Sequence, residues 1–349
     1  MQSLHGIVTR YFRFAFLLSL ALIISATSTS TNAQQPASNP FETRDRGIQL
    51  YKQGDVKEAI RQLQAALRKN RDDSNSWYYL GLSLTRDGQL KEATSAYEAA
   101  TKLQPNWANA RAGLAFTLLL RNKLKEALSE AERALSVDPV LVDAHYIIGV
   151  VRLRNGENGK ALEAAEAALR LDPGYARAYL LKSQALVSFF QGTELPPNDD
   201  SREKRSARYK EAAESLEKYL KLSPGTKNES TWREELEALQ FSANMLGKTA
   251  DAQTTFAPGE VKVRARVLKK QEPSYTDLAR QNQVTGTVIL RAVFTADGKV
   301  KHIIVVRGLP DGLTEQAIAA ARTIKFVPAT REGKAVSMWM ELEYRFNLY

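Results

Sequence analysis

Hydrophobic and polar residues alternate along residues 335–349, at the end of the chain. A period of two places one set of side chains on each face of a β-strand. The pattern therefore predicts a long strand with one buried face. The apolar set consists of Val336, Met338, Met340, Leu342, Tyr344, Phe346 and Leu348.

The residues before this strand predict a small sheet with helices. Two β-branched runs, residues 286–295 and 300–307, are joined by Ala-Asp-Gly-Lys, and Asp-Gly is typical of a tight hairpin turn. Residues 313–324 carry apolar side chains at helical spacing, and a shorter helix is expected over residues 274–280. We therefore predict a small α+β domain over residues 267–349, in the order helix, two strands, helix, strand.

A different period, 34 residues, governs the chain from residue 40 onward. Small residues recur where paired helices would cross, and a proline recurs after the second helix of each pair. Gly or Ala at a crossing lets the helix axes approach, and proline ends a helix. The periodic positions are Gly47, Gly81, Ala115 and Gly149; Ala59, Ala93, Ala127 and Ala161; Ala66, Ala100, Ala134 and Ala168; and Pro105, Pro139 and Pro173. The pattern resembles the tetratricopeptide repeat (TPR) and predicts an all-α solenoid.

The fifth repeat is interrupted. Its first helix is expected over residues 176–190, and its second helix, residues 209–224, comes late in the period. The insertion at residues 191–206 is rich in Pro, Asn, Asp and charge, so we expect a surface loop, either tolerated or binding. The predicted domains are a solenoid of five repeats over 40–224, a capping helix within 225–248, a linker at 249–266 whose end pairs with the sheet, and the α+β domain at 267–349.

Short motifs follow one another along the last domain: Glu272-Pro-Ser-Tyr275, Ala279-Arg280, Val284-Thr-Gly286-Thr-Val288, Asp297-Gly298-Lys-Val300, Gly312-Leu, Phe326-Val-Pro328-Ala329 and Gly333-Lys-Ala-Val336. In order and spacing they resemble the TonB C-terminal domain, and the resemblance covers almost all of residues 273–346. One departure is Thr276, where the family commonly has proline. The resemblance implies a small α+β fold that binds the N-terminal box of outer-membrane receptors by adding a partner strand.

The last strand is the first predicted partner-binding surface. An open strand edge offers unpaired N–H and C=O groups to a neighbouring chain. The resemblance carries this role to the face that the core does not need, and the alternative is that these side chains face solvent or that the tryptophan packs under a helix. The residues are Trp339, Glu341, Glu343 and Arg345.

The groove of the solenoid is the second predicted surface. Aromatic and aliphatic side chains on one face of the first helices can hold a peptide by burial. The alternative is that they seal the packing between neighbouring repeats. The Lys and Asn clamp that some TPR proteins use for C-terminal carboxylates does not occur at the matching positions. The groove residues are Tyr78, Phe116, Tyr146 and Leu180.

Composition argues for binding rather than catalysis. The chain has no cysteine, which excludes disulfides and cysteine metal sites, and the isolated His5, His145 and His302 form no catalytic or metal-binding set. No phosphate-binding glycine loop occurs. We expect no enzyme activity, no cofactor, no metal and no small-molecule substrate.

The net charge is +10, and residues 258–349 contribute +6 of it, with fifteen Lys and Arg against nine Asp and Glu. This excess fits either an acidic partner or membrane surface, or a solubilising surface. No basic run is interleaved with aromatic residues, so a nucleic-acid partner is not expected.

The first residues have the layout of an export signal. Arg10 and Arg13 precede an uncharged stretch, residues 14–26, which is short for a membrane span, and a small polar stretch ends at Ala33. We expect a signal peptide at residues 1–33 and a periplasmic or envelope location. The alternative is an uncleaved inner-membrane anchor with the chain facing the periplasm.

Together these features predict an exported binding protein. The resemblance implies docking to an outer-membrane receptor segment, recruitment of an unknown ligand by the TPRs, and TonB-dependent transport, with inner-membrane motor subunits as further candidate partners. The alternative is a structural scaffold of the envelope without a transport role.

Overall fold

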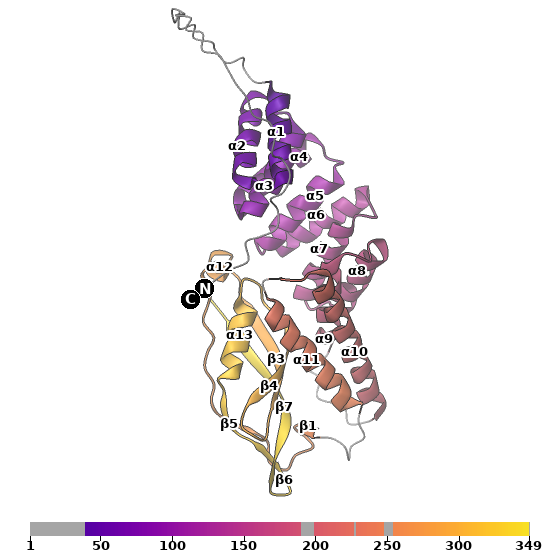
Figure 1. Ribbon diagram of the computed structural model, residues 1–349, viewed down its shortest axis with the longest axis vertical. Helices are drawn as coiled ribbons and strands as arrows, with labels where there is room; N and C mark the ends of the chain where they lie inside the picture. The colour runs from indigo at the N-terminus through magenta and orange to yellow at the C-terminus, as the bar shows by residue number, and fades with distance from the viewer. Residues whose placement is uncertain (1–38, 190–198, 227, 248–253, 349) are drawn as a thin grey trace, which may run out of the picture. The chain divides into compact units, whose positions relative to one another are not determined.

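The computed structural model describes residues 39–189, 199–226, 228–247 and 254–348 (Figure 1). The expected signal peptide lies outside these ranges, as do residues 191–198 of the expected insertion. Within the described ranges, no helix combines the length and the apolar character that a membrane crossing requires.

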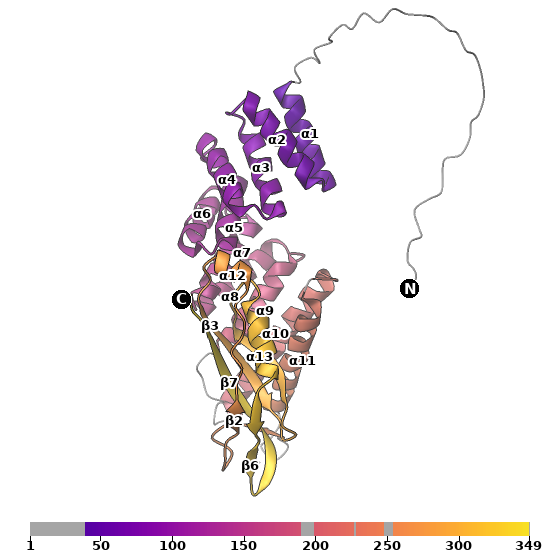
Figure 2. The ribbon, with the colours of Figure 1, turned by 90° about the vertical axis from the view of Figure 1, so that its left-hand side faces the viewer.

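Helices in antiparallel pairs form the first part of the chain, as the repeat predicts. Figure 2 shows these pairs stacked one after another. This part is the TPR solenoid, and the fold class predicted for it is confirmed. The helices are α1 Pro40–Gln53, α2 Val56–Lys69, α3 Ser74–Asp87, α4 Leu90–Leu103, α5 Ala108–Leu120, α6 Leu124–Val137, α7 Val142–Arg154, α8 Asn158–Leu171, α9 Ala176–Ser188 and α10 Asp199–Leu222.

The small residues lie where the helices cross. A Cβ atom on Gly81 would lie 2.9 Å from the Tyr97 ring, and one on Gly149 would lie 2.6 Å from Leu181 Cδ2. Ala59 and its counterparts in the next three repeats are completely buried. The 34-residue period therefore reflects close helix packing.

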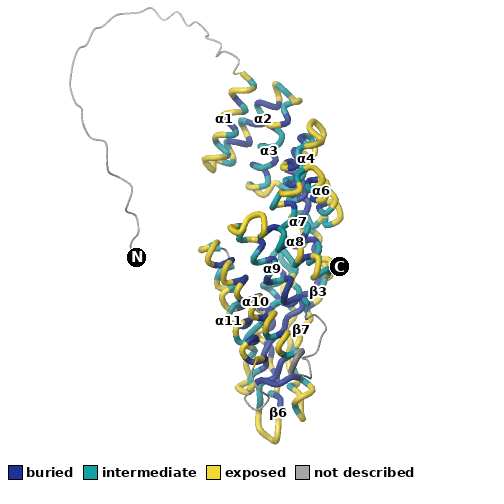
Figure 3. The backbone as a smooth tube through the Cα atoms, turned by 90° about the vertical axis from the view of Figure 1, so that its right-hand side faces the viewer, coloured by how far each residue is buried: buried dark blue, intermediate teal, exposed yellow. Residues whose placement is uncertain are grey.

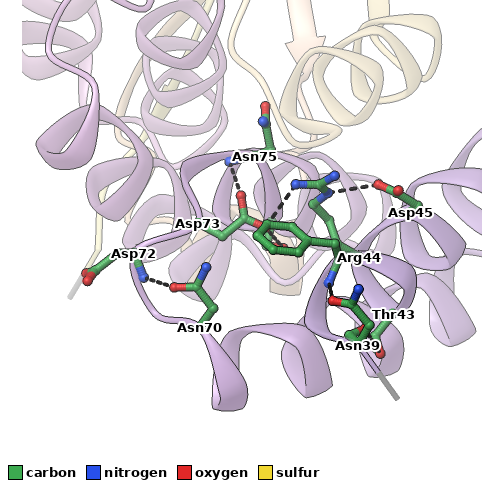
Figure 4. Close-up of polar contacts among 10 residues, drawn as sticks. Asn39, Thr43, Arg44, Asp45, Asn70, Asp72, Asp73 and Asn75 are labelled. Carbon is green, nitrogen blue, oxygen red and sulfur yellow. Dashed lines mark hydrogen bonds and ion pairs between the residues drawn. The ribbon is translucent and has the colours of Figure 1, made fainter. Parts of the chain in front are cut away.

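Polar side chains define where the first helices begin (Figure 4). The Asn39 Oδ1 atom accepts a hydrogen bond from the Phe41 amide, and Asp73 Oδ1 accepts one from the Asn75 amide. These bonds satisfy amides that have no partner inside a helix. Arg44 Nη1 lies 3.7 Å from Asp73 Oδ2, so an ion pair joins the first repeat to the second.

The end of the solenoid differs from the prediction. Helix α10 begins at Asp199, so residues 199–206, expected in a surface loop, are helical. Arg205 in this extension is only 6% exposed, which shows that this turn packs against the rest of the molecule. A helix lies within the predicted range 225–248 as α11 Glu229–Leu246, which packs along α10, and its role as a solenoid cap stays a prediction.

The last part of the chain has the predicted order of helix, two strands, helix and strand. Its sheet has the strand order β1-β7-β3-β4, and β6 also pairs with β7. The small α+β fold is therefore confirmed. The elements are β1 Thr255–Phe256, β2 Arg266–Lys269, α12 Asp277–Gln281, β3 Gly286–Phe294, β4 Val300–Arg307, α13 Leu313–Arg322, β5 Lys325–Val327, β6 Ala329–Arg331 and β7 Lys334–Phe346.

Strand β7 pairs with β3 in a continuous antiparallel register, from Gly286 opposite Phe346 to Phe294 opposite Met338. Met340, Leu342, Tyr344 and Phe346 of its apolar set pack in a core that includes Leu313 and Ala317 of α13, whereas Leu348, predicted in the same set, is exposed. Figure 3 shows the buried residues along β3 and β7. The period of two therefore identified the buried face of this strand.

The predicted linker contains a strand. Thr255 and Phe256 form β1, which runs parallel to β7 beside Ser337 and Met338, and both residues are buried. The sequence analysis predicted no strand at these two positions, because a two-residue strand is too short to show a period. The expected pairing of the linker's end is confirmed, since β2 pairs with β5 and Val263 bridges Thr330.

The solenoid and the sheet share a hydrophobic core. One cluster of buried residues contains Leu216 of α10 and Leu239 of α11 together with Ile289 of β3 and Ile304 of β4. Within the described residues, the solenoid and the sheet domain are therefore packed against each other. The predicted linker also joins them along the chain. The exact domain boundaries stay a prediction.

Candidate protein-binding site

The two edges of β7 are used differently. On one side, β3 pairs with residues 338–346. At the start of β7, residues 334–336 pair with β6, and residues 337 and 338 pair with β1. Among the described strands, none pairs with residues 339–346 on the side away from β3. We call this stretch, which has no strand partner on that side among the described residues, the open edge.

One side chain of the chain itself reaches the open edge. Lys270 Nζ lies 2.5 Å from the Glu343 carbonyl oxygen and donates to it, and the same ammonium lies 4.3 Å from the centre of the Tyr344 ring. We infer that the Glu343 carbonyl points away from β3. Because backbone groups of alternate residues point to opposite edges of a strand, the N–H groups of Glu341, Glu343 and Arg345 point to the open edge.

The side chains predicted for this site have different surroundings. Trp339 is 5% exposed, and its ring lies 6.0 Å from that of Phe241 in α11. The alternative that this tryptophan packs under a helix is therefore confirmed, and its side chain does not lie on the surface. Only its backbone remains at the open edge.

The three charged residues of the site are less buried than Trp339. Glu341 Oε2 forms an ion pair of 3.2 Å with Arg291, which is itself buried. Glu343 and Arg345 are exposed, and their charged groups are 3.8 Å apart. The structure therefore leaves Glu343 and Arg345 as the predicted side chains that a partner strand would meet.

The opposite edge of the sheet, at β4, is covered by the solenoid. The Val305 amide donates to Glu235 Oε1 of α11 at 3.2 Å, and the Ser188 hydroxyl of α9 donates to the Val306 carbonyl at 2.7 Å. Polar groups of the solenoid thus satisfy backbone groups of β4. We call this the closed edge.

Glu235 is a buried acidic residue at the closed edge that the sequence did not predict. Its side chain is buried, its Oε2 atom has no hydrogen-bond partner, and burial raises the pKa of this carboxyl to about 7. Beside it, His302 stacks on Phe241 at 3.9 Å, and burial lowers the pKa of this imidazole. The signal for Glu235 was its place on the apolar face of α11, between Trp232 and Leu239.

The predicted groove residues are half-buried. Tyr78 packs against Trp107, with ring centres 4.6 Å apart, and the Arg177 guanidinium lies 5.6 Å from the centre of the Phe116 ring. Tyr78, Phe116 and Tyr146 pack against the same hydrophobic cluster, whereas Leu180 packs against the cluster shared with the sheet. They therefore make inter-repeat contacts and keep some exposed surface, and their role in binding stays a prediction.

The described residues contain no group of three or more His, Asp or Glu side chains that could hold a metal ion. His145 and His302 lie apart: a ring nitrogen of His145 contacts the Pro139 carbonyl at 3.0 Å, and His302 stacks on Phe241.

Two family models match the chain. The model of the Gram-negative bacterial TonB protein C-terminal domain matches residues 271–348. The tetratricopeptide repeat model matches residues 44–110, 113–176 and 149–187. The chain is thus a TPR protein with a TonB-type C-terminal domain. Both modules mediate protein interactions, and the TonB-type domain suggests an envelope location.

Solved structures of TPR proteins resemble part of the chain. A crystal structure of MamA protein is 25% identical with a TM-score of 0.43, covering 52% of this chain and 94% of its own. TTC0263, a thermophilic TPR protein in Thermus thermophilus, is 20% identical with a TM-score of 0.44, covering 58% and 100%. YrrB, described as a TPR protein with an unusual peptide-binding site, is 17% identical with a TM-score of 0.41, covering 56% and 92%. No curated protein matches the chain.

Proposed function

We propose that this protein docks outer-membrane receptors by strand addition at the open edge of β7 and recruits a second protein through its TPRs, in TonB-dependent envelope transport. The observation that carries the proposal is that β3 pairs with one side of residues 339–346 while no described strand pairs with the other. The layout of residues 1–33 supports a periplasmic location for this activity.

Strand addition fits the chemistry of this edge. A partner strand would bond to the outward N–H and C=O groups, which gives affinity that tolerates different sequences. Specificity would come from alternate side chains, and the exposed Glu343 and Arg345 offer one charge of each sign. The partner would also replace Lys270 at the Glu343 carbonyl.

Proline substitution tests this proposal. Glu343→Pro removes an N–H group that points to the open edge and leaves the pairing with β3 in place, since the residues bonded to β3 are its neighbours. We expect this variant to lose capture of receptor barrels from detergent-solubilised envelopes. Glu343→Ala, which keeps the N–H group, is the matched control. Undiminished capture by the proline variant, with unchanged helical circular dichroism, would exclude strand addition at this edge.

A structural scaffold is the second candidate function. The core that the solenoid shares with the sheet favours it, because a sheet packed against the solenoid can serve as a fixed assembly surface. The same capture experiment separates the two functions. Receptor barrels together with inner-membrane motor subunits support transport, whereas envelope proteins of neither kind support the scaffold.

A further inference from the structure

A cavity of about 400 Å³ lies where the solenoid meets the sheet domain. One wall comes from α7 and α9, and another comes from the start of α11. The connection from β4 to α13 closes it, from Val305 to Glu315. Tyr146, a predicted groove residue, and Trp232 supply aromatic surface. The cavity therefore continues the predicted groove and is built by both domains.

The wall from the sheet domain is held in place by its own hydrogen bonds. Thr314 Oγ1 accepts from the Leu309 amide at 2.8 Å, and the Asp311 carbonyl accepts from Thr276 Oγ1 at 2.6 Å. Asp311 has a left-handed backbone with φ of 61°, and its Oδ2 atom accepts from Asn282 at 2.8 Å. This wall is therefore preformed, and a ligand that binds there would pay little entropy cost for ordering the wall.

Two arginines give the cavity its charge. Arg154 is the last residue of α7, and its Nη1 atom donates to the Leu119 carbonyl at 3.5 Å. Arg307 is the last residue of β4. Its guanidinium lies beside Gly156, in the turn after α7, because a Cβ atom built on this glycine would be 3.1 Å from Arg307 Nη2. Among the described residues, no carboxylate lies within 4.0 Å of either guanidinium.

The acidic residues of the cavity are bonded elsewhere. Asp311 accepts from Asn282, and Glu315 Oε1 accepts from Asn228 at 2.7 Å. Burial lowers the pKa of Arg154, and the charge of Asp311 offsets part of this effect. Both arginines are half-buried, and a partly desolvated guanidinium without a close anion carries an electrostatic cost that an incoming anion would reduce.

We propose that this cavity binds a carboxylate of an acidic peptide that lies along the TPR groove, with Arg154 and Arg307 as its anchors. A guanidinium can donate two parallel hydrogen bonds to one carboxylate, and the nearby aromatic surface suits the apolar part of a peptide. The inference rests on the proposed recruitment of a protein by the solenoid, and it specifies the chemistry of that partner.

The test uses the chain from residue 34 onward and an array of synthetic octapeptides in three matched sets. The first set has free C-terminal carboxylates and no acidic side chain. The second has amidated C-termini and an internal glutamate, and the third has amidated C-termini without any acidic residue. Binding of the first set identifies a terminal carboxylate as the ligand, and binding of the second identifies an acidic side chain.

We expect Arg154→Met and Arg307→Met each to weaken binding of the acidic peptides at least about tenfold, which corresponds to about 1.4 kcal/mol. Arg152→Met is the matched control, because Arg152 lies in the same helix, pairs with Glu157 and Glu132, and does not line the cavity. Two separate arginine variants keep the test valid if one of them fails to fold.

Three results would overturn the inference. The first is binding of the third set alone, and the second is no binding of either set that carries a carboxylate. The third is that both arginine variants bind these peptides with the affinity of the wild type. The variant Glu343→Pro separates this test from that of the open edge. We expect it to bind the acidic peptides as the wild type does. If Glu343→Pro loses binding of these peptides while the two arginine variants keep it, the peptides bind at β7 and the cavity is not their site.

Discussion

The two edges of one sheet are treated in opposite ways. At β4, the helices α9 and α11 cover the strand, and Ser188 and Glu235 bond to its backbone. At β7, residues 339–346 face no described strand, and only the Lys270 side chain reaches a carbonyl there. An uncovered edge is a hazard for aggregation unless it is guarded or used. The comparison therefore indicates that the solenoid closes one edge of the sheet, and the proposed partner strand would use the other.

The largest expected effect comes from breaking the closed edge. Ile304 is completely buried in the core that the sheet shares with the solenoid. Ile304→Ala should lower the free energy of unfolding by about 2–5 kcal/mol, because it removes buried methyl groups and leaves a cavity. Urea unfolding measures this change. Leu268→Ala, at an exposed position of β2, should change stability by less than about 0.5 kcal/mol. Equal effects of the two variants would refute the shared core.

The next effect concerns pH at the closed edge. The pKa of Glu235, about 7, lies above its ordinary value of 4.5, so the folded state holds a proton that the unfolded state releases between these values. Stability should therefore fall as pH rises from 4.5 to about 7, by on the order of 3 kcal/mol. Unfolding of the wild type and of Glu235→Gln at about pH 5 and about pH 8 measures the difference.

Glu235→Gln should remove this pH dependence and leave the opposite contribution of His302. The pKa of His302 is lowered, so the unfolded state binds more protons in that range and stability rises with pH. The other charged groups that line the same hollow are Glu234 and Glu237 of α11, Lys301 of β4 and Arg322 of α13. Identical pH profiles for the variant and the wild type would show that Glu235 does not titrate at the closed edge.

A third variant acts on the helix crossing that supports α9. A Cβ on Gly149 would lie 2.6 Å from Leu181 Cδ2 and 3.2 Å from the Ala164 Cβ. Gly149→Leu should therefore destabilise the protein by about 1–3 kcal/mol through overpacking. Gly159→Leu is the control, since its nearest neighbour would lie 3.9 Å away. An unchanged melting temperature for Gly149→Leu would show that Gly149 does not lie at a closely packed helix crossing.

The smallest effect belongs to the open edge. Lys270→Ala removes the side chain that competes with a partner for the Glu343 carbonyl. Affinity for a captured receptor segment should rise about two- to threefold, which corresponds to about 0.5 kcal/mol. Lys269→Ala removes the same charge one residue earlier and serves as the control. A weaker affinity in Lys270→Ala than in the control would mean that Lys270 helps to bind the partner.

Periodic features of the sequence were sufficient to predict the repeats and the main strands. Helix crossings need small residues at a fixed interval, and a strand with one buried face needs alternation, so both leave regular signals. Strand β4 and the start of α13 lie at the predicted residues. The two-residue strand β1 left no such signal, because its pairing depends on β7.

The site was harder to predict than the fold. Alternation placed Trp339 on the face away from the sheet core, but α11 covers that face at Phe241. Residues far apart in sequence create this contact, as they do for Glu235 with Val305 and for Arg154 with the cavity wall. A single sequence indicates which face of a helix or strand is apolar. It does not show which other helix or strand packs on that face.

Amide hydrogen exchange in β7, followed by NMR, tests the central claim most directly. The amides of Glu341, Glu343 and Arg345 should exchange rapidly, because they point to the open edge, whereas those of Leu342 and Tyr344 should be protected by β3. The Val305 amide, bonded to Glu235 at the closed edge, should also be protected. Equal protection of all the β7 amides in the free protein would contradict an open edge.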